Sequence, residues 1–284
     1  MRSGRFAPSP SAALHIGNLR TAVLAWLFAR SSGRRFLIRV EDLDDRTDSD
    51  MAARQLADLA AIGVISDDPP EHQTAHAARY DGVIAELSRR GLVYECYCSR
   101  RDILGAPRAP HAPEGAYPGT CRDREPPADP GRPPALRLRS DTFSYTVHDV
   151  LHGEFTGVVD DFVLRRGDGV TAYNLAVVID DAAQDIDQVV RGDDLLSSSP
   201  RQAYLGALLG YPPVSYAHVP LVLNTEGKRL AKRDGAVTLA EIGVQPALTA
   251  IAASLGYAGT TLDAMLAEFD PTTLPREPWV YRPV

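Results

Sequence analysis

The sequence predicts an α/β protein whose Rossmann-type parallel sheet is split by an insertion and followed by a short helical region. Three observations predict this organisation. Over residues 1–95, apolar strand-like segments alternate with amphipathic segments of helical period, which is typical of a parallel sheet. From residue 105 the chain becomes rich in proline and glycine. After residue 234 its pattern is again mainly helical.

The first part of the chain supplies most of the expected parallel sheet. We expect a strand that ends at residues 5–7, then a loop and a helix over 17–31. Residues 34–44, RRFLIRVEDLD, are predicted to form a second strand that ends in carboxylates. Amphipathic helices are expected at 51–63 and 77–91.

The second part changes character twice. Residues 105–134 are predicted to be irregular, and residues 135–196 to be rich in strands, with candidates at 135–140, 143–157, 161–166 and 177–181. A helix at 199–211 and a strand at 218–224 follow, before helices and a proline-rich end. The predicted units are 1–95 and 135–240 for the sheet domain with the rest of the insertion, 96–134 for the irregular insertion, and 241–284 for the helical region.

Composition limits the functional classes. The 284 residues carry a net charge of −7, which argues against a surface that is basic throughout but allows a local basic patch for nucleic acid. We see no signal peptide, and the longest apolar run, AVLAWLFA, is too short to span a membrane. These features predict a cytoplasmic protein with no membrane partner, and we expect a monomer.

The stretch APSPSAALHIGN, residues 7–18, is the first candidate site. A loop between a strand and a helix, in that order, is the arrangement that a mononucleotide-binding fold uses. A helix N-terminus offers positive potential and free N–H groups to a phosphate. His15, Gly17 and Asn18 are therefore candidate ATP-binding residues, and the alternative is a proline-rich turn that only starts a helix.

A second candidate is the basic stretch RLAKRDGAVTL at 229–239. Lys228, Arg229, Lys232 and Arg233 crowd this loop. Such runs are usually solvated, but a lysine on a mobile loop can also neutralise a polyphosphate during phosphoryl chemistry.

HIGN and RLAKR resemble the paired His-Ile-Gly-His and Lys-Met-Ser-Lys-Ser signatures of class I aminoacyl-tRNA synthetases. RFAPSPSAALHIGNLRTAVLAWLFARSSGRRFLIRVEDLD is similar to the start of the glutamyl branch, and the likeness continues to FDPTTLPREPWV. It fits best the short, glutamyl-Q branch. The chain departs from the family in the loop, where Ser-Pro-Thr-Gly-Pro is replaced by residues 9–13, SPSAA, without the glycine.

The resemblance implies activation of L-glutamate by ATP with Mg²⁺, through a glutamyl-adenylate. The acceptor it implies is queuosine, at the first anticodon position of tRNA(Asp). His15, Asn18 and Lys232 would be catalytic, and Lys232 would also bind ATP. The alternatives are a truncated glutamyl-tRNA synthetase that charges the 3′ end, a small-molecule nucleotidyltransferase, or a non-catalytic zinc-bearing RNA-binding module. The fifty or so residues after Lys232 are fewer than an anticodon-binding domain needs.

The charges of glutamate indicate which residue types its binding pocket needs. Glutamate has two carboxylates and one ammonium, so a selective site needs a guanidinium and a carboxylate. Arg5, Ser9, Glu41, Tyr173 and Arg191 stand at the positions that bind glutamate in the family. We expect the two arginines to share the carboxylates and Glu41 to hold the ammonium. Taken singly, each of these residues could instead form a surface ion pair.

All three cysteines lie between residues 96 and 121, which favours a metal site over a disulfide framework. Cys96, Cys98 and Cys121 supply three ligands, and zinc prefers four. By resemblance to the short branch, Tyr117 is the fourth, with His111 as the competing ligand. A site closed by protein ligands would be structural.

Overall fold

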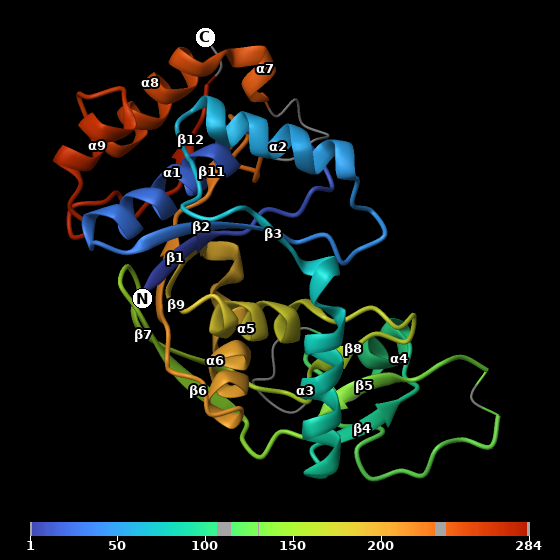
Figure 1. The fold of residues 1–284 in the computed structure, drawn as a ribbon. Coiled ribbons are helices and arrows are strands. Elements are labelled where there is room, and N and C mark those ends of the chain that lie inside the picture. Colours follow the sequence, from blue (N-terminus) through green and yellow to red (C-terminus); the bar gives the residue numbers. More distant parts are fainter. Residues whose placement is uncertain (1, 107–114, 130, 231–236, 283–284) are drawn as a thin grey trace.

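The computed structural model describes residues 2–106, 115–129, 131–230 and 237–282. Its main feature is a seven-stranded sheet with the order β3-β2-β1-β9-β10-β6-β7 (Figure 1). All neighbouring pairs from β3 to β6 are parallel, and only β7 runs antiparallel to β6. The prediction of a Rossmann-type parallel sheet is confirmed. The strands are β1 (Ser3–Phe6), β2 (Arg35–Val40), β3 (Glu71–His72), β6 (Ser144–Asp149), β7 (Gly153–Val158), β9 (Ile186–Gly192) and β10 (Ser215–Val219).

Helices cover both faces of this sheet (Figure 1). The helix α1 (Ile16–Ser31) packs on β1 and β9, and twelve of its sixteen residues are buried, as expected for a helix that is apolar all round. Two C-terminal helices, α8 (Val244–Leu255) and α9 (Leu262–Glu268), pack against α1. On the other face lie α5 (Tyr173–Ala183) and α6 (Ser199–Leu208).

A smaller antiparallel sheet lies at one end of the molecule. It has the order β4-β5-β8, with β4 (Val93–Cys96), β5 (Ala135–Leu138) and β8 (Val163–Arg165). The hairpin of β6 and β7 lies between β5 and β8 in sequence but joins the main sheet (Figure 1). The remaining elements are α2 (Ser49–Ala61), η1 (Gln73–His76), α3 (Ala77–Arg89), α4 (Arg100–Gly105), η2 (Asp193–Ser198), β11 (Val222–Leu223), α7 (Leu239–Ile242) and β12 (Trp279–Val280).

Three predicted elements differ from the structure. The strand expected at 177–181 is wrong, because these residues belong to α5. The strand expected at 34–44 ends at Val40, and its carboxylates belong to the following loop. The strand expected at 218–224 is interrupted by Pro220, which cannot donate a ladder hydrogen bond, and its two halves pair with different strands.

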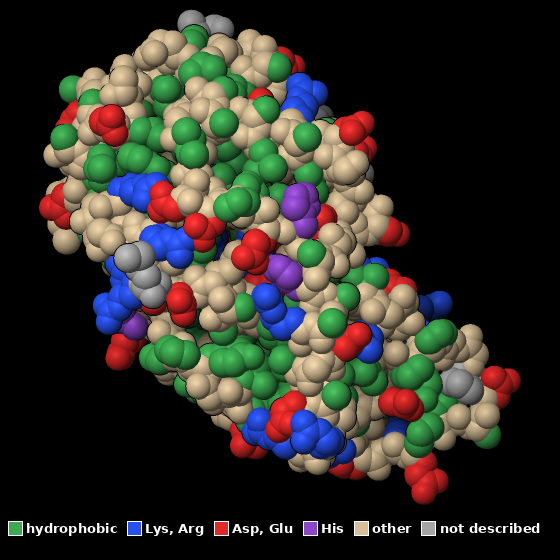
Figure 2. Space-filling model, viewed as in Figure 1, with side chains coloured by type: hydrophobic (Ala, Val, Ile, Leu, Met, Phe, Trp, Pro, Cys, Tyr) green, Lys and Arg blue, Asp and Glu red, His purple; other side chains and the backbone are tan. Residues whose placement is uncertain are grey.

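The surface agrees with the modest negative charge. On the face shown in Figure 2, basic and acidic side chains of the described residues are interspersed, without one large basic field. No helix in the described ranges is long and apolar enough to cross a bilayer.

Candidate active site

The opening loop joins the first helix through a cap made by His15. The imidazole Nδ1 accepts hydrogen bonds from the backbone N–H groups of Gly17 (3.1 Å) and Asn18 (3.3 Å). In return, the Asn18 side-chain oxygen accepts one from the His15 N–H at 3.1 Å. A Cβ on Gly17 would lie 2.9 Å from the His15 ring, so this reciprocal cap needs glycine. Local packing therefore explains part of the His-Ile-Gly-Asn order.

The cap corrects one prediction. The sequence predicts free N–H groups for phosphate at the start of α1, but those of Gly17 and Asn18 bond to the imidazole, and that of Ile16 bonds to the Val237 carbonyl (3.1 Å). Burial lowers the pKa of His15 to about 4, so its ring is neutral near pH 7. Since Nδ1 accepts, the single ring proton is on Nε2, and this N–H is the group that can donate to a phosphate.

A cavity of about 150 Å³ opens beside the cap. His15, Gly17 and Asn18 line it together with Arg191 and Arg229. These residues come from the loop after β1, from β9 and from the segment after β11, so the cavity lies at the carboxyl edge of the sheet. This edge is where ligands bind in open α/β sheets.

Residues near both ends of the basic stretch at 229–239 lie close to this cavity. Arg229 lines the cavity and pairs with Asp194, while Thr238, on the far side of the stretch, forms a β-bridge with His15. Lys232 and Arg233 lie outside the described residues.

Three arginines and a histidine form a row across one face of the sheet. In the strand register, Arg5 is opposite Leu37 and Val189, and Arg191 is opposite His218. Arg39 and Arg191 lie two residues beyond those partners, and side chains two residues apart share a face. The row therefore runs Arg39, Arg5, Arg191, His218 across β2, β1, β9 and β10.

The first two arginines of this row are already paired with a carboxylate. Arg5 is 3% exposed and approaches both oxygens of Asp181 through Nε (3.2 Å) and Nη2 (3.4 Å). Arg39 is fully buried and donates to Asp181 at 2.8 Å. Burial alone would raise the pKa of Asp181, but the two guanidinium groups outweigh this and hold it below its ordinary value.

Arg191 differs because its partners are neutral. It is 6% exposed and donates to the Tyr173 hydroxyl (3.1 Å), the Ser199 hydroxyl (2.8 Å) and His218 Nε2 (3.0 Å). Within the described part of the chain, no carboxylate oxygen lies within 4.0 Å of its guanidinium nitrogens. A buried guanidinium is costly without a negative partner, so this site is suited to bind an anion.

Of the other predicted glutamate-binding residues, Glu41 and Tyr173 contact this row. Glu41 follows β2 and lies 3.7 Å from Arg39, and burial raises its pKa above the ordinary value although nearby arginines oppose this. Tyr173 begins α5 and is 38% exposed; its oxygen accepts from Arg191, so its own proton can go to a ligand. Ser9 is exposed on the loop after β1, and the Gln55 side chain of α2 donates to the carbonyl groups of Ser9 and Ala12.

The cysteines meet at the small sheet, apart from this row. The sulfur atoms of Cys96, Cys98 and Cys121 all lie within 4.8 Å of one another. The Tyr117 hydroxyl joins them, 3.4 Å from the Cys96 sulfur and 3.9 Å from the Cys98 sulfur. His111 lies outside the described residues. Three thiols and one phenol oxygen, gathered in this way, fit the four ligands of a closed tetrahedral zinc site.

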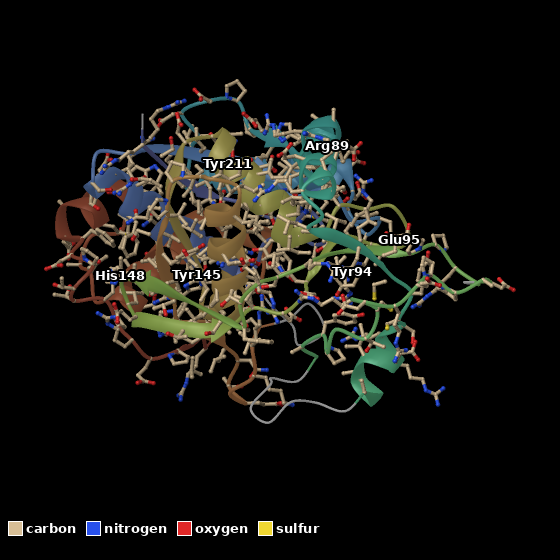
Figure 3. All side chains as sticks on the ribbon, turned by 90° about the horizontal axis from the view of Figure 1, so that it is seen from below. Arg89, Tyr94, Glu95, Tyr145, His148 and Tyr211 are labelled. Atoms are coloured by element: carbon tan, nitrogen blue, oxygen red, sulfur yellow. The ribbon has the colours of Figure 1, made fainter. Side chains whose placement is uncertain are left out.

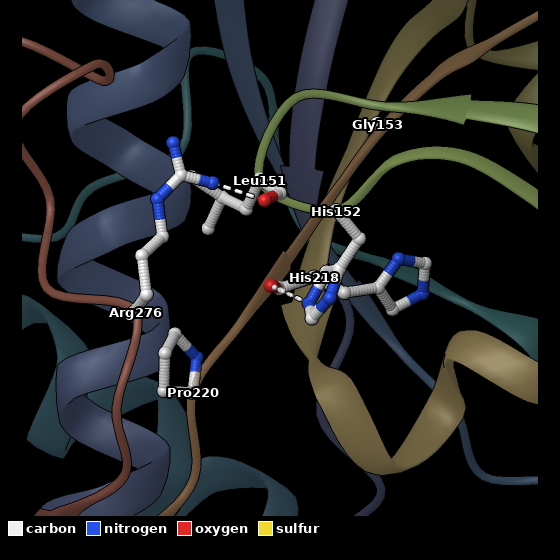
Figure 4. A pocket seen from close by; sticks show the side chains of 6 residues that line it. All are labelled: Leu151, His152, Gly153, His218, Pro220 and Arg276. Carbon is white, nitrogen blue, oxygen red and sulfur yellow. Dashed lines mark hydrogen bonds between the residues drawn. The ribbon is translucent and has the colours of Figure 1, made fainter.

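Two histidines that the sequence analysis did not select, His148 and His152, lie on or next to the β6–β7 hairpin. Figure 3 shows His148 on the β6–β7 hairpin, away from Tyr94 and Glu95 on β4. A second cavity, of about 500 Å³, is lined by six residues that include His152 and Arg276 (Figure 4). None of the predicted site residues lines it.

The main residues that sequence reasoning missed are Asp181, Arg39, His218 and Asp149. Arg39 stands two residues before Glu41 in the strand predicted at 34–44, so the period of two could have placed both on the site's face. The other three come from distant parts of the chain, and no local pattern connects them.

Comparison with known proteins shows which family the sequence resembles. Residues 3–254 match the family described as tRNA synthetases class I (E and Q), catalytic domain. The chain is 59% identical over 288 residues to the glutamyl-Q tRNA(Asp) synthetase of Nocardia farcinica, covering 98% of this chain and 92% of that protein. It is 41% identical to the glutamyl-Q tRNA(Asp) synthetase of Symbiobacterium thermophilum, covering 98% of this chain and 95% of that protein.

Solved structures agree in fold. The glutamate tRNA ligase of Elizabethkingia meningosepticum, in complex with its amino acid, has a TM-score of 0.81 and 24% identity. The match covers 99% of this chain and 67% of that one. The chain therefore belongs to the class I tRNA synthetases of the glutamate and glutamine type, which are ligases, and within them to the glutamyl-Q tRNA(Asp) synthetase family.

Proposed function

We propose that the protein activates L-glutamate with ATP and transfers the glutamyl group to queuosine, at the first anticodon position of tRNA(Asp). In the first step a glutamate carboxylate attacks the α-phosphate of ATP, which forms glutamyl-adenylate and releases pyrophosphate. In the second, a hydroxyl of the queuosine cyclopentenediol attacks the activated carbonyl, which forms an ester and releases AMP. No covalent enzyme intermediate is needed.

The observation that carries this proposal is Arg191, a buried guanidinium that has no carboxylate partner among the described residues and that lines the cavity beside His15. Arg191 would bind a carboxylate of glutamate, and Tyr173 would donate its hydroxyl proton to the same ligand. Glu41 would hold the ammonium group. Arg5 keeps one nitrogen, Nη1, free of Asp181, and we assign to it a weaker share of the substrate's negative charge.

The nucleotide would lie in the cavity at the start of α1. His15 Nε2–H would donate to a phosphate oxygen. Asn18 lines the same cavity, and its side-chain N–H group would donate to the nucleotide as well. Lys232 would neutralise the β- and γ-phosphates, which carry Mg²⁺. Arg229 and Thr238 support this role because they anchor both ends of the basic stretch at the cavity.

The acceptor is inferred from the relatives. Those with 59% and 41% identity over nearly the whole chain are named for glutamyl-Q and tRNA(Asp). The cyclopentenediol of queuosine supplies the hydroxyl nucleophile that the terminal ribose supplies in ordinary charging, so the adenylate chemistry is the same. The rival is a protein that charges the 3′ end of tRNA(Glu).

Zinc would be held by Cys96, Cys98, Cys121 and Tyr117. The guanidinium of Arg137 lies 3.6 Å from the centre of the Tyr117 ring, and this cation–π contact helps to hold the ring beside the thiols. A metal here would fix the irregular segment to the small sheet and supply no step of the reaction.

Two assays test the proposal. ATP–pyrophosphate exchange without RNA should depend on glutamate, and equal rates with glutamine would contradict the pocket. Labelled glutamate is then given to tRNA(Asp) that lacks its terminal adenosine, with or without queuosine. Labelling should require queuosine and should be prevented when the tRNA is treated with periodate beforehand, because periodate cleaves the free cyclopentenediol. Labelling of intact tRNA(Glu) at its 3′ end would instead support the rival.

A further inference from the structure

The partners of Arg191 belong to a relay of hydrogen bonds that ends on a buried carboxylate. Asp149, at the end of β6, accepts from His218 Nδ1 at 2.6 Å, and His218 Nε2 lies 3.0 Å from Arg191 Nε. Asp149 and His218 are both fully buried. None of these contacts touches the zinc cluster.

The protonation of His218 follows from its two neighbours. Burial alone would raise the pKa of Asp149, but the hydrogen bonds from His218 and from two backbone N–H groups outweigh this and lower it to about 2. Asp149 is therefore an anion, and it accepts a hydrogen bond from a protonated Nδ1 of His218. Arg191 Nε can only donate, so His218 Nε2 must accept, and the ring is neutral with its proton on Nδ1.

The relay is fixed in place by the turn after β6. One Asp149 oxygen accepts from the backbone N–H groups of Leu151 (2.8 Å) and His152 (3.0 Å), and the other accepts from the His218 N–H. Figure 4 shows the next contact, in which His152 Nε2 donates to the His218 carbonyl at 3.1 Å. The end of β6 and the turn after it therefore fix the imidazole of His218 through Asp149 and the His218 backbone through Asp149 and His152.

The effect on Arg191 is positional rather than electrostatic. A carboxylate in direct contact would fix the guanidinium but would also neutralise it, as Asp181 does for Arg5. A neutral imidazole fixes Nε with a lone pair and leaves the positive charge available, while Ser199 holds Nη2. The guanidinium fork is thus oriented before a substrate arrives.

We propose that Asp149 and His218 are positioning residues that lock Arg191 in the orientation that binds the substrate carboxylate. This inference rests on the proposed glutamate-binding role of Arg191. It adds two specificity-determining residues from β6 and β10 that do not touch the substrate themselves.

Two substitutions at one position test it. In His218→Gln, the amide oxygen can take the place of Nε2 and accept from Arg191, but the donor to Asp149 is lost. In His218→Asn, the amide nitrogen can take the place of Nδ1 and donate to Asp149, but the acceptor for Arg191 is lost. The KM for glutamate and for ATP are measured by pyrophosphate exchange, together with thermal unfolding.

The asparagine variant should raise the KM for glutamate about tenfold or more, and the glutamine variant about threefold or less, with the KM for ATP unchanged in both. The exposed His148, on the same hairpin, gives the control variant His148→Gln, which should change neither constant. If His218 only anchored the hairpin through Asp149, the order would reverse. Glutamine would then be the more harmful variant, with lower thermal stability and poorer binding of both substrates.

A spectroscopic test separates this inference from the proposed function. Nitrogen-15 NMR of the imidazoles in the intact protein should show His218 with a protonated Nδ1 and an unprotonated Nε2. A protonated Nε2 would overturn the relay even if glutamate is the substrate. A wild-type protein with no glutamate-dependent exchange would overturn both the proposed function and the positioning role for glutamate, whatever the tautomer.

Discussion

Replacing Arg191 by glutamine is the sharpest test of the pocket. The substitution removes a positive charge that is 6% exposed and has only neutral hydrogen-bond partners. Among the described residues the change breaks no ion pair, and only the more distant Glu41 loses one of the positive charges that lower its pKa. The change should therefore leave the free energy of unfolding unchanged or slightly increased, because an uncompensated buried charge is unfavourable.

Activity should respond in the opposite way. The loss of a desolvated charge pair with the substrate costs roughly 2–5 kcal/mol, which corresponds to about 30-fold to several thousand-fold in kcat/KM for glutamate. The ratio of kcat/KM for glutamate to that for glutamine should also fall, because the charge of the side-chain carboxylate would no longer be recognised. The KM for ATP should change much less.

Arg5→Gln is the matched contrast, because it sits in the same row but shares Asp181 with Arg39. This variant leaves a buried carboxylate with one guanidinium instead of two and should cost on the order of 1–3 kcal/mol of stability, or about 2–4 °C in Tm for each kcal/mol. Pyrophosphate exchange and thermal unfolding are measured on both variants. A fall of less than about threefold in kcat/KM for Arg191→Gln, or a loss of stability equal to that of Arg5→Gln, would refute the reasoning.

Three further outcomes are expected. The pKa of Glu41 is raised, and Glu41 must be ionised to bind the substrate ammonium, so the KM for glutamate should rise as the pH falls through that pKa. Glu41→Gln should flatten this pH dependence. A KM that depends as steeply on pH in the variant contradicts the assignment of Glu41 to the ammonium. Metal analysis should give about one zinc per chain, lost in Cys98→Ser and weakened in Tyr117→Phe but kept in His111→Ala, whereas release by the last variant alone would transfer the ligand role to the histidine. Gly17→Ala would bring a Cβ to 2.9 Å from the capping imidazole and should raise the KM for ATP while that for glutamate stays constant, and an unchanged KM for ATP would separate the cap from nucleotide binding.

Much of the fold was predictable because local patterns carry it. The alternation of strands and helices in the first half, the glycine that closes the helix predicted at 77–91, and the proline-rich insertion all follow from composition and period. Residues 177–181 failed because VVIDD is apolar and β-branched, yet it forms the middle of α5. Its two aspartates are buried there by partners from β1, β2 and η1, and these tertiary contacts override the local preference.

The position of the predicted site residues follows the sequence better than their electrostatics do. Family positions brought Arg5, Glu41 and Arg191 to the same edge of the sheet, and the strand register places the two arginines on one face. Nothing in the sequence shows that Asp181 pairs with Arg5, or that His15 uses the N–H groups at the start of α1. Both facts depend on side-chain contacts between or within elements that no period encodes.

The unequal arginines also explain how the pocket could prefer a doubly charged substrate without an excess of positive charge in the core. Two unpaired guanidinium groups side by side would repel each other and would destabilise the fold before any ligand bound. With Asp181 between Arg5 and Arg39, the β1 and β2 side of the row carries little net charge, and the attraction for a carboxylate is concentrated at Arg191. The cost of the buried guanidinium of Arg191 is limited by four neutral hydrogen-bond acceptors, from α5, η2, α6 and β10. An amide of glutamine could form hydrogen bonds there but would leave that charge unneutralised, so the proposed selectivity for glutamate rests on the one arginine of this row that has no carboxylate partner among the described residues.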